Sequence, residues 1–280
     1  MGLTKKIKKT IKYFLKGAPD LYTSVEVKIA DSKNMLKNRN VLITGGSRGI
    51  GFAIAKKCLS EGATVIITGR DKDGLIKACR ELGNNSYYFV MDVTDTKSFK
   101  NLFSMLEEKF SIDKIDSLIS NAGISLHEKS FREVSEENWD SQFNTNLKGN
   151  YFLVKEFVKY LEQKENKKGN IVVISSERAQ RPDSIPYGLT KVATNSFVKA
   201  MAVDLIKNDI RINSVAPGVT ASDMTGFDKN NNLYAEWQPT KRIFVPEEIA
   251  EVVNFLLSDI SACISGEIIN CDLGKYILKW

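Results

Sequence analysis

From Asn40 to the end of the chain, short apolar runs alternate with longer segments of helical periodicity. Runs of about five residues that are apolar on both faces are typical of strands buried between two layers of helices. Strand and helix in alternation favour a parallel, doubly wound α/β sheet with helices on both faces. The seven predicted strands are Val41–Thr44, Thr64–Thr68, Tyr87–Met91, Ser117–Ser120, Ile171–Ser175, Arg211–Val215 and Glu267–Cys271, and the predicted helices cover residues 49–61, 71–82, 95–110, 136–162, 186–208 and 246–257.

The first 39 residues follow a different pattern. A basic amphipathic helix is predicted there, because apolar residues recur every four positions among lysines, at Leu3, Ile7, Ile11 and Leu15. Ala18-Pro19-Asp20 ends this helix, and the residues up to 39 form a connector. We therefore expect an extension at 1–39 and a single domain at 40–280. Residues 1–18 are expected to lie on an anionic membrane surface or to form a solvated or partner-packed extension.

Charge and composition exclude several classes of protein. Residues 1–16 hold six lysines and no acid, and the remaining 34 basic residues balance 34 acidic ones. A neutral domain does not predict nucleic-acid binding, which needs a basic patch. Four scattered cysteines and one histidine, His127, predict neither a disulfide scaffold nor a metal site. No apolar run reaches the roughly 20 residues of a membrane span. The scattered cysteines are typical of reduced thiols, so we expect a cytoplasmic protein.

Residues 41–51, VLITGGSRGIG, place glycines between a strand and a helix. Gly45 permits a tight turn, while Gly49 and Gly51 let backbone approach a phosphate and let the helix pack on the strand. The helix N-terminus then offers free N–H groups and partial positive charge to a pyrophosphate. This context predicts a dinucleotide site rather than a βα turn without a ligand.

Tyr187 and Lys191 in YGLTK stand at positions i and i+4 of a predicted helix, so both side chains share one face. A phenol has a pKa near 10 and is a poor acid or base at neutral pH. A neighbouring ammonium favours the phenolate, so we expect Lys191 to lower the pKa of Tyr187. The pair could then exchange a proton with a carbonyl or alcohol oxygen.

These two motifs, TGxxxGIG and YxxxK, resemble the short-chain dehydrogenase/reductase family in its compact single-domain branch, over residues 40–274. The resemblance implies a Rossmann-type sheet and an oxidoreductase that interconverts a small-molecule carbonyl and a secondary alcohol, similar to 3-oxoacyl reductases or related ketone reductases. It implies four catalytic residues, namely Asn146, Ser176, Tyr187 and Lys191. Asn146 would kink a helix and hold a water, and Ser176 would bind the substrate carbonyl. Because Ser176 precedes Tyr187 by 11 positions, about two fewer than in many members, Ser175 is the alternative.

The family pattern also implies which residues contact a nicotinamide dinucleotide. Besides Tyr187 and Lys191 they are Gly45, Ser47, Arg48, Gly49, Ile50 and Gly51 in the turn, Asp92 and Val93 near adenine, Asn121, Ala122 and Gly123 after the fourth strand, and Pro217, Gly218 and Thr220 near the nicotinamide. Asp272-Leu273-Gly274 departs from the usual D-G-G at Leu273.

The second strand ends in Gly69 and Arg70, where relatives that use NAD carry an acid for the adenosine ribose. Arg70 and Arg48 suit a 2′-phosphate, because guanidinium matches phosphate geometry and stays charged. We therefore expect NADP(H). The neighbouring Asp71 leaves NAD(H) open.

Residues 219–243 are expected to form either a lid over the site or a subunit contact. The family resemblance implies a homodimer or homotetramer that forms through residues 136–162 and 186–208. These segments carry more apolar residues than a single stripe facing the core needs, namely Phe152, Phe157, Phe197 and Met201. Two other functions stay open: a catalytically silent, cofactor-sensing or membrane-tethered scaffold, and a relative that modifies sugars or sugar nucleotides. The glycine spacing argues against the second.

Overall fold

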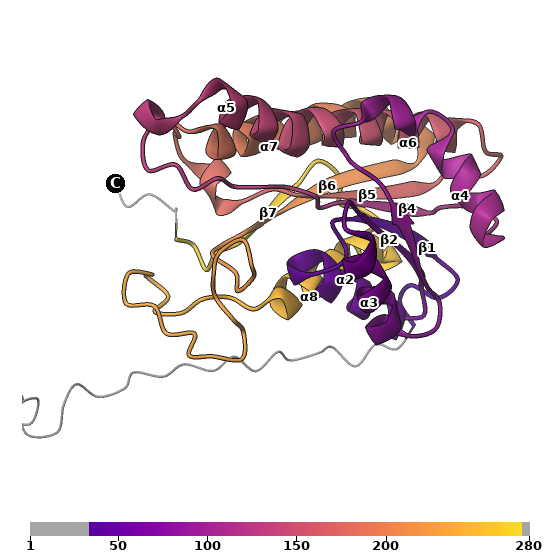
Figure 1. The fold of residues 1–280 in the computed structure, drawn as a ribbon. Helices are drawn as coiled ribbons and strands as arrows, with labels where there is room; N and C mark the ends of the chain where they lie inside the picture. Colours follow the sequence, from indigo (N-terminus) through magenta and orange to yellow (C-terminus); the bar gives the residue numbers. More distant parts are fainter. Residues whose placement is uncertain (1–33, 276–280) are drawn as a thin grey trace, which may run out of the picture.

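One sheet of seven parallel strands forms the centre of the molecule, in the order β3-β2-β1-β4-β5-β6-β7 (Figure 1). The computed structural model describes residues 34–275. The strands are β1 Asn40–Thr44, β2 Thr64–Gly69, β3 Ser86–Val90, β4 Ser117–Ser120, β5 Gly169–Ile174, β6 Ile210–Pro217 and β7 Ile268–Cys271. All seven predicted strands are confirmed. The chain adds β2 and β3 on one side of β1 and β4 to β7 on the other, so the strand order reverses between the neighbours β1 and β4. Such a reversal opens a crevice at the carboxyl ends of the strands.

Helices cover both faces of the sheet (Figure 1). On one face lie α2 Gly49–Ser60, α3 Lys72–Leu82 and α8 Pro246–Leu257, and on the other lie α4 Leu102–Phe110, α5 Glu136–Phe143, α6 Asn150–Glu162 and α7 Pro186–Leu205. Short 3-10 turns are η1 Thr96–Phe99, η2 Phe131–Glu133, η4 Glu177–Gln180, η5 Ile206–Asn208 and η6 Asp259–Ser261. This arrangement confirms the predicted doubly wound fold.

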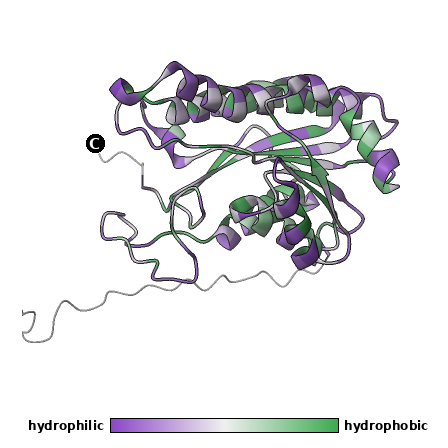
Figure 2. Cartoon of the chain, viewed as in Figure 1, coloured by the Kyte–Doolittle hydropathy of each residue, from purple (hydrophilic) through white to green (hydrophobic). Residues whose placement is uncertain are grey.

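Two hydrophobic layers hold the helices on the sheet. Leu42, Leu118 and Ile171 point to the face of α4, α6 and α7, whereas Ile43 and Val172 point to the face of α2 and α8. The strands are accordingly among the most apolar segments of the chain (Figure 2). The side chains of a strand alternate between the two faces of the sheet. Strands that are apolar on both faces are therefore buried only when a layer of helices covers each face.

Two predicted helices differ from the structure. The segment 95–110 divides into η1 and α4, because Asn101 adopts a left-handed backbone with φ 61°. The segment 136–162 contains a π-helical stretch, η3 Asn144–Gly149, between α5 and α6. A β-carbon on Gly149 would lie 2.3 Å from the Val93 carbonyl oxygen, so this glycine lets the π-helical stretch approach the end of β3.

The predicted basic helix at 1–18 lies outside the described residues. Part of the connector is nevertheless in contact with the domain, since Leu36 is fully buried and its N–H donates to the Glu61 carbonyl at 3.0 Å. Within residues 34–275, no helix is long and apolar enough to cross a membrane.

Candidate active site

The turns that carry the predicted chemistry follow the carboxyl ends of five strands. Because all the strands are parallel, these ends lie along one edge of the sheet. This edge brings together the glycine turn after β1, Arg70 after β2, Asn121 after β4, Ser176 after β5 and Gly218 after β6.

The glycine turn after β1 has the geometry that a phosphate cradle needs. Gly45 and Gly49 adopt φ values of 65° and 55°, which disfavour other residues. A β-carbon on Gly51 would lie 2.3 Å from the Gly45 carbonyl oxygen, so the turn folds directly onto the start of α2. No side chain caps the N-terminus of α2, and its first turn contains no acid. Its N–H groups can therefore bind an anion, and the turn fits the pyrophosphate of a dinucleotide.

Thr44 and Asn121 lock this turn to β4. The Thr44 hydroxyl accepts hydrogen bonds from the N–H groups of Asn121 and Ala122, both at 2.9 Å. The Asn121 side-chain amide donates back to the carbonyls of Thr44 at 2.9 Å and Gly45 at 3.1 Å. The Asn121 side chain is therefore committed to shaping the turn.

Asn146 lies fully buried in the π-helical stretch. Its Oδ1 accepts from the Ile124 N–H and its Nδ2 donates to the Ile124 carbonyl, each at 2.8 Å. A β-carbon on Gly123 would lie 3.3 Å from Asn146 Oδ1 and 3.7 Å from Lys191 Nζ. Asn146 Oδ1 and Lys191 Nζ thus both lie close to Gly123, on the side where a β-carbon would point.

Ser176, rather than Ser175, faces Tyr187. The Ser176 hydroxyl hydrogen-bonds the Tyr187 phenol and accepts from the Arg178 N–H at 3.2 Å. The Ser175 hydroxyl instead donates to the Lys191 backbone carbonyl at 3.4 Å. The shorter loop before Tyr187 therefore still brings Ser176 to the phenol.

Burial raises the pKa of Tyr187, and the Ser176 hydrogen bond and the Arg178 charge offset part of this effect. Burial also lowers the pKa of Lys191 to about 8. The prediction that Lys191 lowers the pKa of Tyr187 is therefore wrong, since burial raises this pKa and Lys191 is not among the groups that lower it. Lys191 Nζ lies 5.6 Å from the Tyr187 ring centre but donates to the Ile174 carbonyl at 2.9 Å. Desolvation of both groups outweighs their proximity.

An ion pair between Arg178 and Asp183 fixes the loop between Ser176 and Tyr187, a role that the sequence alone did not predict. Arg178 Nε donates to Asp183 Oδ2 at 2.6 Å, and the Asp183 side chain is only 4% exposed. A β-carbon on Gly188 would lie 2.0 Å from Asp183 Oδ2, so the glycine after Tyr187 makes room for this carboxylate. The ion pair thereby holds a guanidinium whose charge acts on Tyr187.

At the adenosine end, Arg70 is exposed after β2. Asp71 accepts from the Asp73 N–H at 3.1 Å and caps α3. Arg48 pairs with Asp223 at 3.1 Å, and both side chains are largely exposed. Asp71, the acid that left NAD(H) open as the cofactor, thus uses its carboxylate to cap its own helix.

Of the pair predicted near adenine, Asp92 Oδ1 accepts from the N–H and hydroxyl of Thr94, both at 2.8 Å. The Val93 side chain is buried in the hydrophobic layer beneath α4 and α6. Any contact of Val93 with a ligand would therefore involve its backbone.

Pro217, the last residue of β6, and Gly218 after it are buried, and the Thr220 hydroxyl donates to the Gly218 carbonyl at 2.9 Å. A β-carbon on Gly218 would lie 2.7 Å from Phe244 and 3.2 Å from Glu177 Oε2. The end of β6 therefore meets the residue that follows Ser176.

The segment 219–243 has a small hydrophobic core of its own, to which Ala221, Leu233, Ala235 and Ile243 contribute. Its Ser222 Cβ would lie 3.5 Å from a β-carbon on Gly49, so the segment borders the glycine turn.

His127 is exposed, and residues 34–275 contain no cluster of His, Cys, Asp or Glu suited to a metal ion.

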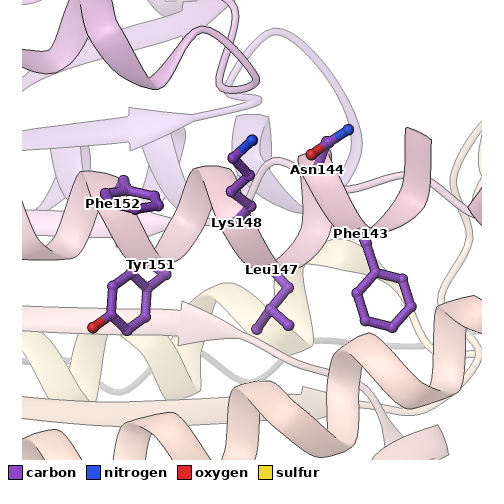
Figure 3. Close-up of a pocket in the computed structure, with 6 residues that line it drawn as sticks. All are labelled: Phe143, Asn144, Leu147, Lys148, Tyr151 and Phe152. Carbon is purple, nitrogen blue, oxygen red and sulfur yellow. The ribbon is translucent and has the colours of Figure 1, made fainter. Parts of the chain in front are cut away.

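The residues predicted to form the assembly surface, 136–162 and 186–208, lie mainly on α5, the π-helical stretch, α6 and α7. An open pocket of about 390 Å³ is lined there by Phe143, Asn144, Leu147, Lys148, Tyr151 and Phe152 (Figure 3). Phe152, Phe197 and Met201 are partly buried at this face. Phe157 was wrongly included, because it is fully buried against Phe103 in the core of its own chain.

Comparison with known proteins identifies the family. A family model described as enoyl-(acyl carrier protein) reductase matches residues 45–275. The chain belongs to the short-chain dehydrogenase/reductase family. It is an oxidoreductase that interconverts a carbonyl and an alcohol with a nicotinamide cofactor.

Two curated relatives in this family are 3-oxoacyl-(acyl-carrier-protein) reductases. The one from Thermotoga maritima is 34% identical over 249 residues, which cover 86% of this chain and 99% of the relative. The one from Aquifex aeolicus is 33% identical over 251 residues, covering 86% and 98%.

Solved structures of the family share the fold. A short-chain type dehydrogenase/reductase from Mycobacterium marinum has a TM-score of 0.77 and 26% identity, with 86% of this chain and 96% of that chain covered. A 3-ketoacyl-(acyl-carrier-protein) reductase from Brucella melitensis, complexed with NADH, has a TM-score of 0.78 and 25% identity, with coverage of 86% and 99%.

Proposed function

We propose that this protein is an NADP(H)-dependent ketone reductase related to the 3-oxoacyl reductases, with Tyr187 as its proton donor. The observation that carries the proposal is the hydrogen bond between Ser176 and Tyr187, with Lys191 beside the phenol ring. The phosphate-binding turn lies along the same edge of the sheet.

Each member of the site has a distinct role in this proposal. The Ser176 hydroxyl and the Tyr187 phenol hold the substrate carbonyl, and Tyr187 gives its proton to the oxygen as the alcohol forms. Lys191 supplies positive charge near the phenolate, and its pKa of about 8 lets it pass a proton at neutral pH. Asn146 is a positioning residue that holds the Ile124 backbone against this site. When bound, the nicotinamide supplies the hydride.

NADP(H) is favoured over NAD(H) by the residues after β2. Arg70 is exposed there, and the carboxylate of the neighbouring Asp71 already caps α3. An exposed arginine suits a 2′-phosphate, because its guanidinium stays charged and matches the geometry of a phosphate.

An Arg70→Ala variant should lose about 10- to 100-fold in affinity for NADPH, because a charge-assisted contact to the 2′-phosphate contributes roughly 1.5–3 kcal/mol. Its affinity for NADH should stay unchanged. Fluorescence titration of both cofactors checks this, with Lys77→Ala, an exposed cation further along α3, as the control. Equal losses for NADPH and NADH would show that Arg70 does not contact the 2′-phosphate.

The direct test of the function is NADPH oxidation by the full chain with a panel of ketones that includes a 3-oxoacyl ester. We expect turnover of at least one ketone. If no ketone is reduced while NADPH binds, the protein is a cofactor-sensing scaffold instead.

Assembly, location and the basic tail extend this proposal. The enzyme would work as a cytoplasmic homodimer or homotetramer through the face of α6 and α7. Contact of residues 1–18 with a membrane surface stays a prediction.

A further inference from the structure

The residue after Ser176 is a buried carboxylate. Glu177 opens the 3-10 turn η4 and is only 4% exposed. Its Oε1 accepts from Lys275 Nζ at 2.7 Å. Its Oε2 is completely buried and has no hydrogen-bond partner among residues 34–275.

The unpartnered oxygen lies close to Gly218. It would lie 3.2 Å from a β-carbon on Gly218, at the end of the strand that pairs with β5. The Glu177 charge also acts on Tyr187, where it raises the pKa of the phenol. Glu177 Oε2 therefore lies at the end of β6, and Glu177 follows Ser176, the residue that holds the substrate carbonyl in the proposed function.

A carboxylate oxygen at this depth requires a donor. Burial raises the pKa of Glu177, and the charge of Lys275 opposes that effect. Lys275 nevertheless satisfies only one of the two oxygens, and an ionised carboxylate can only accept hydrogen bonds. A pocket for an unsubstituted acyl chain would gain nothing from such a group, because apolar atoms cannot donate to it.

We propose that Glu177 recognises a hydroxyl group next to the reacting carbonyl, so that the preferred substrate is a hydroxy ketone. This inference rests on the proposed function and narrows its substrate class. The carboxamide N–H of the nicotinamide is the other possible donor, and the experiment separates the two sources.

The experiment compares two ketones of equal shape, 3-hydroxy-2-butanone and 3-methyl-2-butanone, in which a methyl group replaces the hydroxyl. The wild type should reduce the hydroxy ketone with a kcat/KM at least about 10-fold higher, since the methyl analogue leaves the buried oxygen unpartnered. In Glu177→Ala this ratio should fall to about 1, mainly through loss of the hydroxy ketone. Glu177→Gln, which keeps the shape and one acceptor oxygen, should fall between the two.

Two controls separate recognition from folding and cofactor binding. Glu107→Gln changes a partly buried carboxylate on α4 that binds Lys164 and Tyr160, and it should leave the ratio unchanged. The dissociation constant for NADPH, measured by fluorescence titration, should stay within about 3-fold in both Glu177 variants, because their contact is with the substrate.

Three results would overturn the inference. Equal kcat/KM values of the wild type for the two ketones would overturn it and leave the proposed function intact. Weaker NADPH binding in the Glu177 variants with an unchanged ratio would assign the oxygen to the nicotinamide carboxamide. Absence of turnover with these ketones and with a 3-oxoacyl ester would overturn the proposed function as well.

Discussion

A Tyr187→Phe variant should bind NADPH as the wild type does and lose about 100- to 10,000-fold in turnover, the range typical of a lost general acid. Phenylalanine keeps the ring beside Lys191 but removes the hydroxyl that hydrogen-bonds Ser176. The substrate oxygen then has no group that can protonate it as the alcohol forms. Fluorescence titration gives the affinity for NADPH, and the rate of NADPH oxidation gives turnover.

Tyr87→Phe is the matched control for this variant. Tyr87 is an exposed tyrosine on β3 whose ring lies 4.9 Å from that of Phe110. Loss of its hydroxyl should leave turnover unchanged. If Tyr187→Phe kept more than about half of the wild-type turnover, another group would have to supply the proton.

Gly51→Ala should abolish measurable NADPH binding, with a loss of at least about 100-fold in affinity. A displacement of the backbone N–H groups of the glycine turn by about 1 Å is enough to break their hydrogen bonds to a phosphate. The added β-carbon would lie 2.3 Å from the Gly45 carbonyl oxygen and 2.6 Å from Asn121 Nδ2. Neither atom can retreat, since Asn121 is tied to Thr44 and Gly45 by its own hydrogen bonds. The turn must therefore open and move its N–H groups away from the phosphate.

Titration of NADPH checks this prediction, with thermal unfolding measured in parallel to confirm that the variant is folded. Lys56→Ala, an exposed position on the same helix, serves as the control and should bind NADPH normally. A Gly51→Ala variant that binds NADPH with wild-type affinity would show that this turn is not the phosphate site.

Local pattern was sufficient to predict most of the fold. Strands that are apolar on both faces, such as Ile171–Ser175, match the structure to within two residues, because burial in two layers leaves a strong signature. The π-helical stretch around Asn146 was predicted only as a kink, through the family resemblance. In this stretch Gly149 closely approaches Val93, which lies 56 residues earlier in the sequence, and such a distant contact leaves no periodic pattern.

The same limit applies to the site. The spacing of Tyr187 and Lys191 correctly placed them on one helix face. The direction of the Tyr187 pKa depends on burial, which spacing does not report. Likewise Glu177 and Asp183 were visible only as charges in a short loop. Their roles follow from how that loop folds against Gly218 and Gly188.

The most direct test of the account follows the hydride itself. A ketone is reduced by the full chain with NADPH that carries two deuterium atoms at C4 of the dihydronicotinamide, and the alcohol is analysed by mass spectrometry. The account predicts one deuterium on the carbinol carbon of the alcohol, and about 100-fold or more less labelled alcohol per unit time from Tyr187→Phe. Alcohol without deuterium, or labelled alcohol formed by the Tyr187→Phe variant as fast as by the wild type, would contradict it.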